Sequence, residues 1–279
     1  MCGIFAVLNT KYLDKKKLEK EFQKGKNRGP EYSKFSDLTS IHCCLGFHRL
    51  AINGVDDELS NQPFFINGIY LVCNGEIYNH KELTKILNII PNSKSDCEII
   101  IHLYQKYGIC QTLQMIDGVF AFVLIDTNTK QIFVARDTYG VRPLFANVYK
   151  TDRCITENDI TKYYTTFAFA SELKSLINIK TNSFDNKIGQ FEPGHFSVFK
   201  YDETLKTHSS TKYTDINHIE DITFSSPNSF STLNNGLKTT ALNTIYNKLY
   251  QAVSKRVDNT ERPIACLLSG GLDSSLIAA

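Results

Sequence analysis

The chain has 279 residues, of which 42% are hydrophobic and 22% charged, and its net charge is +2. This balance is typical of a folded globular protein and excludes a disordered chain. The near-neutral charge argues against nucleic acid or an acidic membrane surface as the main partner, and no apolar run approaches the ~20 residues that span a bilayer.

The eight cysteines are scattered along the chain, and no CxxC pair occurs. The N-terminus, Met1-Cys2-Gly3-Ile4-Phe5, lacks the basic start of a secretory signal, so disulfides are not indicated. The histidines do not cluster with cysteines at the spacing of zinc ligands, so we expect no metal site of that kind. A reducing, cytoplasmic location is the simplest interpretation.

Many short strands and few helices are expected in the first two hundred residues. Residues 3–8 are an apolar run typical of a buried strand, and the lysine-rich stretch Lys11–Lys24 predicts a surface helix. Further strands are expected at Ile41–Phe47, Ile69–Cys73, Gly118–Asp126 and Gln131–Asp137, the last two joined as a hairpin.

Two helices interrupt these strands. A capping box at Asn79–Glu82 precedes a helix that Pro91 ends, with one apolar face made of Leu83, Ile86, Leu87 and Ile90. A second capping box at Ser95–Glu98 begins another helix, which Gly108 closes. Strands and helices without βαβ alternation indicate an α+β fold.

The composition changes along the last third of the chain. We assign residues 2–200 to a first domain, 201–236, rich in Asn, Ser and Thr, to a linker, and 237–279 to the start of a second domain. In this last part a helix is expected to bury a face made of Ala241, Ile245, Leu249, Val253 and Val257. The strand Ile264–Leu268, apolar on both faces, is typical of a parallel sheet, but one strand cannot form a sheet, so this domain is incomplete as given.

Cys2 is the first candidate for chemistry. Removal of Met1 would give one residue both a thiol and a free α-amine, whose ordinary pKa near ~8 lets it take the thiol proton at neutral pH. The alternative interpretation is a buried strand cysteine without chemistry.

Four further residues carry groups that suit an amino-acid substrate. Asn74 and Gly75 could give a side-chain amide and a main-chain N–H to an oxyanion, or could form the Asn-Gly turn of a hairpin. Arg49 could bind a carboxylate through two hydrogen bonds, or be an ordinary surface arginine at a strand end. Asp96 could bind an ammonium group, or simply favour a helix N-terminus.

The stretch Ser269–Ser275 (SGGLDSS) follows an apolar segment and precedes a helix. Glycines let main-chain N–H groups approach phosphate oxygens, and the serines add donors. No lysine follows the glycines, so this is not the common G-x-x-x-x-G-K-[ST] loop, and a plain glycine turn remains the alternative.

With these residues in place, the chain resembles the glutamine-hydrolysing asparagine synthetases, class II amidotransferases with an N-terminal cysteine, and it looks closer to their eukaryotic branch. The matching stretches are, in order, MCGIF, RGP, GFHRLA, NGEIYNHK, GVFAFVLID, RDTYGVRPLF and LLSGGLDSSL. The resemblance implies a four-layer αββα N-terminal-nucleophile hydrolase sandwich, followed by the incomplete start of an α/β ATP-pyrophosphatase-type nucleotide-binding domain.

The resemblance also implies roles for individual residues. Cys2 would attack the side-chain amide of glutamine, with Asn74 and Gly75 as the oxyanion hole. The glutamine-binding residues would be Arg49, Ile52, Asn53, Asn74, Gly75, Glu76 and Asp96. The ATP-binding residues would be Leu267, Ser269, Gly270, Gly271, Asp273, Ser274 and Ser275. The ammonia would amidate aspartate with ATP and Mg²⁺, whereas the glutaminase half would need no cofactor.

Two departures from the family pattern bear on this expectation. Glu31 stands where the family usually has aspartate after Arg-Gly-Pro, for which we expect a small effect. The family's chain also continues past the SGGLDSS loop, so we expect glutaminase activity at most unless another polypeptide completes the synthetase. Candidate partners are a separate synthetase polypeptide and a second copy of this chain. Competing interpretations are another class II amidotransferase, against which the SGGLDSS loop argues, and a non-catalytic binding or assembly remnant.

Overall fold

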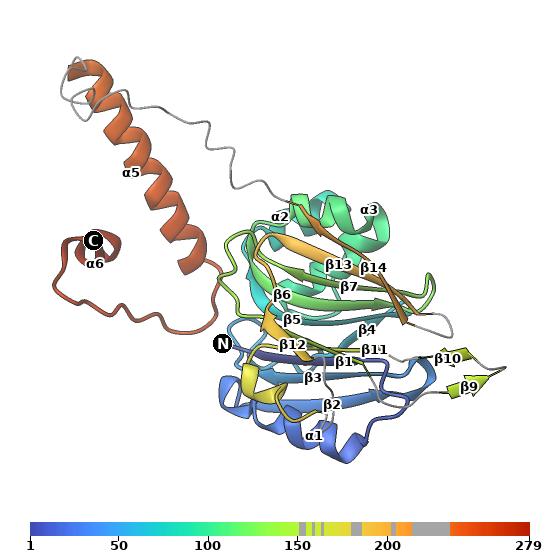
Figure 1. Cartoon of the computed structure of the whole chain (residues 1–279). Helices are drawn as coiled ribbons and strands as arrows, with labels where there is room; N and C mark the ends of the chain where they lie inside the picture. The colour runs from blue at the N-terminus through green and yellow to red at the C-terminus, as the bar shows by residue number, and fades with distance from the viewer. Residues whose placement is uncertain (151–154, 158–159, 163–164, 180–185, 202–204, 214–234) are drawn as a thin grey trace. The chain divides into compact units, whose positions relative to one another are not determined.

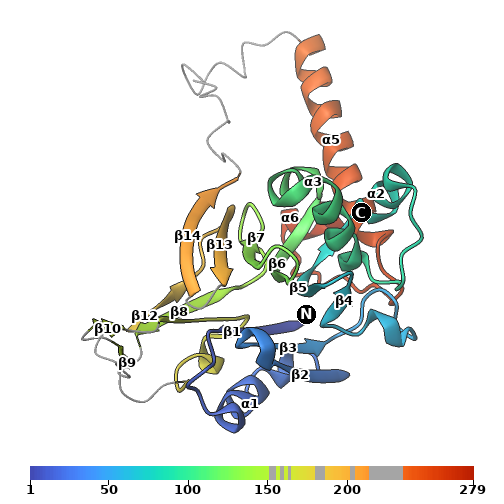
Figure 2. The same ribbon diagram turned by 90° about the vertical axis from the view of Figure 1, so that its right-hand side faces the viewer.

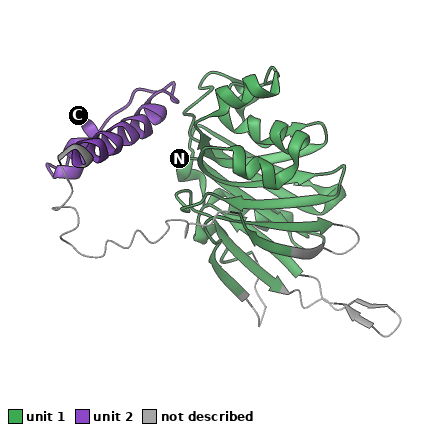
Figure 3. Ribbon diagram, turned by 90° about the horizontal axis from the view of Figure 1, so that it is seen from above, with its two compact units in different colours: residues 1–215 green, residues 216–279 purple. Residues whose placement is uncertain are grey.

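The computed structural model describes residues 1–279 except 151–154, 158–159, 163–164, 180–185, 202–204 and 214–234. Two compact units make up the chain, Met1–Asp215 and Ile216–Ala279 (Figure 3). Most of the linker expected at 201–236 lies outside the described residues.

Two antiparallel six-stranded sheets form the first unit. In spatial order, the first sheet contains β12 (Asn186–Gln190), β8 (Phe145–Lys150), β11 (Thr165–Ala170), β1 (Gly3–Leu8), β3 (Cys43–Arg49) and β2 (Tyr32–Leu38). The second contains β14 (Leu205–Lys212), β13 (His195–Tyr201), β7 (Gln131–Arg136), β6 (Gly118–Asp126), β5 (Ile69–Ile77) and β4 (Phe64–Ile66). A separate ribbon pairs β9 (Ile155–Glu157) with β10 (Ile160–Lys162).

Helices cover the outer faces of the two sheets (Figures 1 and 2). Helix α1 (Lys15–Gln23) packs Leu18 and Phe22 against the first sheet, and α2 (His80–Leu87) and α3 (Ile99–Met115) pack on the second. A third apolar cluster fills the space between the sheets. The layers therefore run helix, sheet, sheet, helix, which confirms the predicted α+β sandwich.

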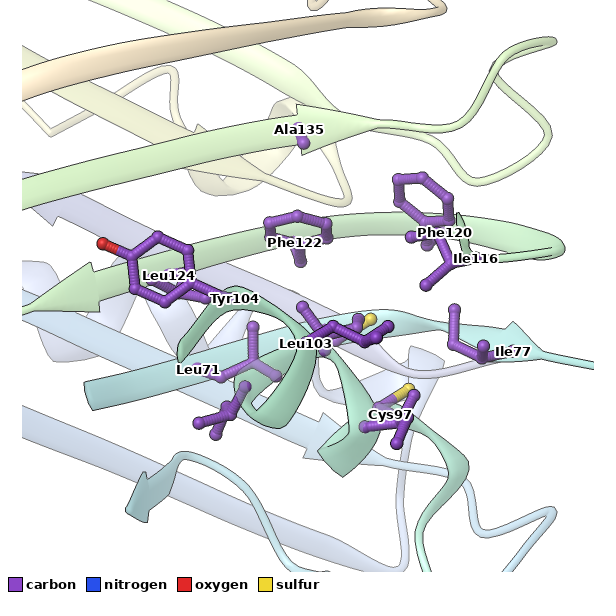
Figure 4. Close-up of a cluster of buried hydrophobic side chains, with 14 of the residues drawn as sticks. Leu71, Ile77, Cys97, Leu103, Tyr104, Ile116, Phe120, Phe122, Leu124 and Ala135 are labelled. Atoms are coloured by element: carbon purple, nitrogen blue, oxygen red, sulfur yellow. The ribbon is translucent and has the colours of Figure 1, made fainter. Parts of the chain in front are cut away.

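Successive side chains of a strand point to opposite faces of its sheet, so alternate residues pack under the helices or between the two sheets. In β5 the odd-numbered Ile69, Leu71 and Cys73 join the cluster under α2 and α3, whereas Val72 faces the other sheet. Figure 4 shows this helix-covered cluster, with side chains from β5, β6 and α3 packed together: Leu71, Ile77, Phe120, Phe122, Leu124, Leu103 and Tyr104. The even-numbered side chains of β5 consequently point into the interior of the sandwich.

Several elements have other limits than the sequence predicted. Helix α1 begins at Lys15, not Lys11, because the Asp14 side chain caps it by accepting from the Lys16 N–H at 2.9 Å. Strand β5 continues to Ile77, so the hairpin-turn interpretation of Asn74 and Gly75 is wrong.

Neither predicted capping box forms completely, although Ser95 is an N-cap as expected. The Asn79 side chain does not cap α2; its amide instead bonds the main chain of Met115 and Asp117. Ser95 accepts from the Cys97 N–H at 3.3 Å, but the Glu98 carboxylate bonds the preceding loop rather than returning to Ser95.

The ends of these two helices are only partly as predicted. Gly108 interrupts the helical geometry as expected, with φ +74° and ψ 173°, but a second helical segment follows and α3 continues to Met115. Helix α2 ends at Leu87, where Asn88 adopts a left-handed conformation, three residues before Pro91. Of the predicted apolar face, Leu83 and Leu87 are buried, whereas Ile86 and Ile90 lie exposed.

The second unit contains α5 (Asn235–Val257) and α6 (Leu272–Ala278), and in its described part no strand occurs. The strand predicted at Ile264–Leu268 is wrong, because an isolated strand leaves its main-chain groups unpaired. The predicted buried face of α5 is likewise exposed at Ile245, Leu249 and Val257. Among the described helices, none combines the length and apolar character needed to cross a membrane.

Candidate active site

Strand alternation brings Cys2 and Asn74 to the same interior. Cys2 is in phase with the inward-facing Ile4 and Ala6 of β1, and it packs against the apolar cluster between the sheets. Asn74 lies on the inner face of β5. One pocket at this end of the sandwich is lined by all of the predicted glutaminase residues: Cys2, Arg49, Ile52, Asn53, Asn74, Gly75, Glu76 and Asp96.

The Leu50 main chain and the Arg28 side chain hold Cys2 in place. Its thiol donates to the Leu50 carbonyl at 3.4 Å and accepts from the Leu50 N–H at 3.5 Å. Its own carbonyl accepts from Arg28 Nε at 2.8 Å. Burial raises the pKa of the Cys2 thiol, partly offset by the bond with Leu50. The thiol is therefore protonated at neutral pH and needs a base before it can attack.

A terminal amine lies beside this thiol. Burial lowers the pKa of the Met1 α-amine, and the nearby Arg28 and Arg142 charges act in the same direction. The Cys2 and Glu76 side chains oppose this shift. An amine whose pKa falls below its ordinary value is more often unprotonated at neutral pH.

Asn74 offers a buried donor to the pocket. Its side chain is 1% exposed, and Nδ2 finds no acceptor among the described residues. Gly75 follows where β5 approaches β6 closely: a Cβ atom there would lie 2.8 Å from the Val119 carbonyl oxygen and 2.9 Å from the Phe120 Cβ. The close approach requires glycine at this position, and it fixes the peptide that carries the Gly75 N–H.

Glu76 forms an ion pair with Arg142 at the edge of the pocket. The loop that carries Arg142 is organised by the buried Asp137 carboxylate, which accepts from the N–H groups of Tyr139, Val141 and Arg142 at 2.9–3.1 Å. The ion pair fixes the Glu76 carboxylate, and with it one negative charge in the pocket.

Arg49 is 7% exposed, so the interpretation as a surface arginine is wrong. Its guanidinium donates to the carbonyls of Asn53 at 3.1 Å, Gly54 at 2.5 Å and Asp57 at 3.3 Å, and to Asn61 Oδ1 at 2.8 Å. Arg49 therefore holds the loop that presents Ile52 and Asn53 to the pocket.

Asp96 does more than favour a helix terminus. Its carboxylate accepts from the Ile77 N–H at 2.6 Å and thereby ties the short 3-10 helix η4 (Asp96–Glu98) to the end of β5. Burial raises the pKa of Asp96 to about 6, with the Ile77 bond opposing the rise. At pH 7 the carboxylate is mostly charged, and a cationic group in the pocket would stabilise that charge.

Glu31 lies next to the loop that follows β3. Its Oε2 accepts from the Ala51 N–H at 2.7 Å, so the longer acid at this position still reaches the loop.

Sequence reasoning assigned no role to three residues around Cys2 and Asn74: Arg28, Gln62 and Arg142. Arg28 and Arg142 lie in the RGP and RDTYGVRPLF stretches, whose residue types could have indicated them. No local pattern marks Gln62.

The predicted ATP-binding residues lie in the second unit. Gly270 has φ +80°, Ser269 and Ser274 exchange a hydroxyl hydrogen bond at 3.0 Å, and Ser275 donates to the Gly271 carbonyl at 2.8 Å. The loop thus offers glycines and hydroxyl donors, which fit phosphate oxygens. Leu267 is 96% exposed, and Asp273 lies in the first turn of α6.

The fit to a magnesium ion is weaker. The part of the chain that the structure describes holds no group of three or more His, Cys, Asp or Glu side chains that could bind a metal ion. Asp273 is the one carboxylate within Ser269–Ser275. An ion at this loop would depend on water molecules and on the phosphates of a bound nucleotide for most of its ligands, as Mg²⁺ commonly does.

A sandwich of two antiparallel sheets between helices, with a near-terminal cysteine facing an amide donor across the interior, defines the class of N-terminal-nucleophile hydrolases. The family model described as "Glutamine amidotransferase domain" matches residues 1–223, and the chain belongs to this family. A second model, described as "Asparagine synthase", matches residues 244–279.

The similar curated proteins confirm the resemblance seen in the sequence. The chain is 37% identical to human "Asparagine synthetase [glutamine-hydrolyzing]" over 294 residues, 38% to the mouse protein over 295 and 36% to the chicken protein over 291. Each comparison covers 100% of this chain and 48% of the relative. The chain therefore spans about half the length of the curated relatives it matches.

Solved structures support the fold alone. A glutamine phosphoribosylpyrophosphate amidotransferase from B. subtilis matches with TM-score 0.55 and 20% identity, covering 76% of this chain and 49% of that chain. A structure described as the allosteric regulatory enzyme of purine biosynthesis matches with TM-score 0.57, at the same identity and coverage.

Proposed function

We propose that the chain hydrolyses glutamine to glutamate and ammonia, with Cys2 as the nucleophile after removal of Met1. The α-amine then belongs to Cys2 itself and takes the proton of its thiol. The sulfur attacks the side-chain amide carbon, and the carbonyl oxygen becomes an oxyanion. Collapse of this intermediate expels ammonia with the proton that the amine returns, and water then hydrolyses the thioester.

The buried Asn74 amide is the observation that carries this proposal. A donor without an acceptor inside a protein is costly, and a donor of this kind beside a pocket suits a ligand that supplies the acceptor. Asn74 Nδ2 shares its pocket with the Cys2 thiol. Together with the Gly75 N–H it would give two donors to the oxyanion, which forms only as the sulfur attacks.

The charges of the pocket suit the amino-acid end of glutamine. Glu76 and Asp96 supply carboxylates for its ammonium group. Arg49 with the Ile52–Asn53 segment would hold its carboxylate; since the guanidinium already bonds four acceptors of its own loop, this role requires the loop to exchange some of these bonds for the substrate.

We further propose that the ammonia serves ATP-dependent amidation of aspartate, a ligase reaction of a synthetase half. The "Asparagine synthase" match at 244–279 and the glycine and serine donors of Ser269–Ser275 support this use of ATP. Bound ATP with Mg²⁺ would supply the activated phosphate, and the loop would hold the phosphate oxygens through Ser269, Gly270, Gly271, Ser274 and Ser275, with Leu267 and Asp273 beside them.

A three-part organisation fits this proposal: a glutaminase domain, a linker and the start of a synthetase domain. The pairing of β14 with β13 within the first compact unit supports a boundary of the glutaminase domain near residue 215 in place of residue 200. A separate synthetase polypeptide as the partner that completes the ligase reaction is part of this proposal, and so, independently, is a homodimer of the chain. A cytoplasmic location agrees with the free thiols of all the cysteines that the structure describes.

The test is release of glutamate and ammonia from glutamine by the purified chain. We expect turnover in the wild type, a loss of several orders of magnitude in Cys2→Ala, and full activity in Cys110→Ala, whose exposed thiol lies outside the pocket. Mass spectrometry of the N-terminus accompanies the assay. Retention of Met1 in an active preparation, or equal turnover by Cys2→Ala, would refute the proposal.

A separate assay addresses the synthetase half. Asparagine formation from aspartate, glutamine and ATP is measured with the chain alone and with a complementing synthetase polypeptide. We expect asparagine in the second mixture. Absence of asparagine from both mixtures, with glutamine hydrolysis intact, would restrict the function to the glutaminase reaction.

A further inference from the structure

Strand β5 has an edge that β4 covers over part of its length. The pairing of β4 with β5 joins Phe64 to Leu71 and Ile66 to Ile69, and it goes no further. Pro63 precedes β4 and has no N–H to give to a ladder, which is one reason why the strand begins only at Phe64. From Cys73 onward, this edge of β5 is therefore left for other groups to bond.

The Gln62 side chain continues the ladder in place of a strand. It accepts from the Cys73 N–H at 2.6 Å and donates to the Cys73 carbonyl at 3.2 Å. The register explains the match, because Phe64 faces Leu71 and position 62 would face Cys73 if the strand continued. A primary amide carries the same donor and acceptor as a peptide group, so this side chain replaces one residue of strand. Gln62 is 3% exposed and lines the pocket of Cys2.

Other side chains bond the next positions on this edge. Main-chain groups two residues apart point to the same side of a strand, so those of Gly75 and Ile77 follow Cys73. The Gly75 carbonyl accepts from the Cys97 thiol at 3.7 Å, and the Ile77 N–H donates to Asp96 at 2.6 Å. The Gly75 N–H points to this same edge, which is where a substrate oxyanion would be bound.

We propose that Gln62 is a positioning residue for the oxyanion hole, an inference that rests on the proposed glutaminase function. Its two bonds hold the peptide groups on both sides of Cys73, and Cys73 directly precedes the two donors. With Gln62 in place, the Asn74 amide and the Gly75 N–H keep their direction toward the carbon that Cys2 attacks. Gln62 does not touch the substrate; it acts through the main chain of β5.

The test compares Gln62→Met with a matched control. Methionine keeps the length of the side chain and removes both bonds to Cys73. Asn79→Leu is the control, because the Asn79 amide also clamps main chain through two bonds, to the Met115 carbonyl and the Asp117 N–H, both 2.9 Å, outside the pocket. The assay gives kcat and KM for glutamine, and mass spectrometry gives the rate of alkylation of Cys2 by iodoacetamide.

We expect Gln62→Met to lower kcat about 10- to 100-fold. This is less than the ~10²–10³-fold loss caused by deletion of an oxyanion donor, because the donors remain and only their direction changes. KM should change less than about 2-fold. Alkylation of Cys2 should be unchanged, since it forms no oxyanion, and Asn79→Leu should keep the wild-type kcat. Equal kcat in Gln62→Met and wild type would overturn the inference and leave the glutaminase intact. The inference would also be overturned if Asn79→Leu lost kcat to the same extent, or if Gln62→Met slowed the alkylation of Cys2. Either result would show a general structural effect. An inactive wild type would overturn the proposed function, and this inference with it.

Discussion

Replacing Asn74 with leucine should separate activity from stability. The substitution removes a donor that is 1% exposed and has no acceptor among the described residues. Loss of one oxyanion-hole donor costs about 10²–10³ in kcat, or about 2.7–4 kcal/mol of transition-state stabilisation. A buried polar group without a partner costs about 1–3 kcal/mol of folding free energy, and leucine, similar in shape to asparagine, removes that cost.

We therefore expect Asn74→Leu to lose at least about 100-fold in kcat. Its free energy of unfolding should rise by about 1 kcal/mol, which is less than the full cost of the unpartnered donor because leucine will not pack perfectly at this position. For a unit of this size, that corresponds to a Tm higher by about 2–4 °C. Steady-state glutamate release and thermal unfolding are the assays. Thr112→Val is the control, since it removes a satisfied buried bond to the Gly108 carbonyl and should lower Tm without changing kcat. A fall in stability like that of Thr112→Val, or a kcat within 10-fold of wild type, would refute the reasoning.

Three further outcomes follow from the same contacts. Because burial raises the pKa of Asp96 to about 6, its charge is lost as pH falls through 6, so KM for glutamine should rise below that pH and become pH-independent in Asp96→Asn. Between pH 4 and 6 the Asp96 carboxyl is protonated more fully in the folded state than in the unfolded state, because its pKa is raised in the folded state. The free energy of unfolding of the wild type should therefore fall as pH rises from 4 to 7, by up to about 3 kcal/mol relative to Asp96→Asn in denaturant unfolding. Glu31→Asp shortens the acid that accepts from the Ala51 N–H, and we expect a loss of about 1 kcal/mol in stability and a change in kcat/KM of less than about 3-fold. A chain shortened to Met1–Asp215 should fold and keep the glutaminase kcat, since this unit contains every residue of the pocket.

The strands of the sandwich could be predicted from the sequence because burial on one or both faces leaves a local pattern. Gly3–Leu8 and Gly118–Asp126 have the limits expected from their apolar runs. The predictions failed where long-range contacts redirect a polar side chain. Asn79 and Glu98 have the spacing of capping residues, but each finds main-chain partners outside its own helix.

The limits of β5 show the same effect at the site. Asn-Gly favours a turn in an isolated hairpin, and the sequence alone could not exclude one. In the folded chain both residues lie in a nine-residue strand paired along its whole length with β6, where the ladder bonds outweigh the local turn preference. Arg28 and Arg142 could have been inferred from their motifs, whereas Gln62 could not, since its role depends on the register between β4 and β5.

The shortness of β4 connects these findings. Had this strand continued to pair beyond Leu71, its main chain would have occupied the edge of β5 at Cys73, Gly75 and Ile77. Three side chains from two segments bond that edge instead: Gln62, which precedes β4, and Asp96 and Cys97 of η4. Side chains can satisfy individual groups and leave others for a ligand, which a continuous strand cannot do. An interrupted sheet edge thus supplies the main-chain donor at Gly75, and the same interruption places the acid at Asp96 beside it.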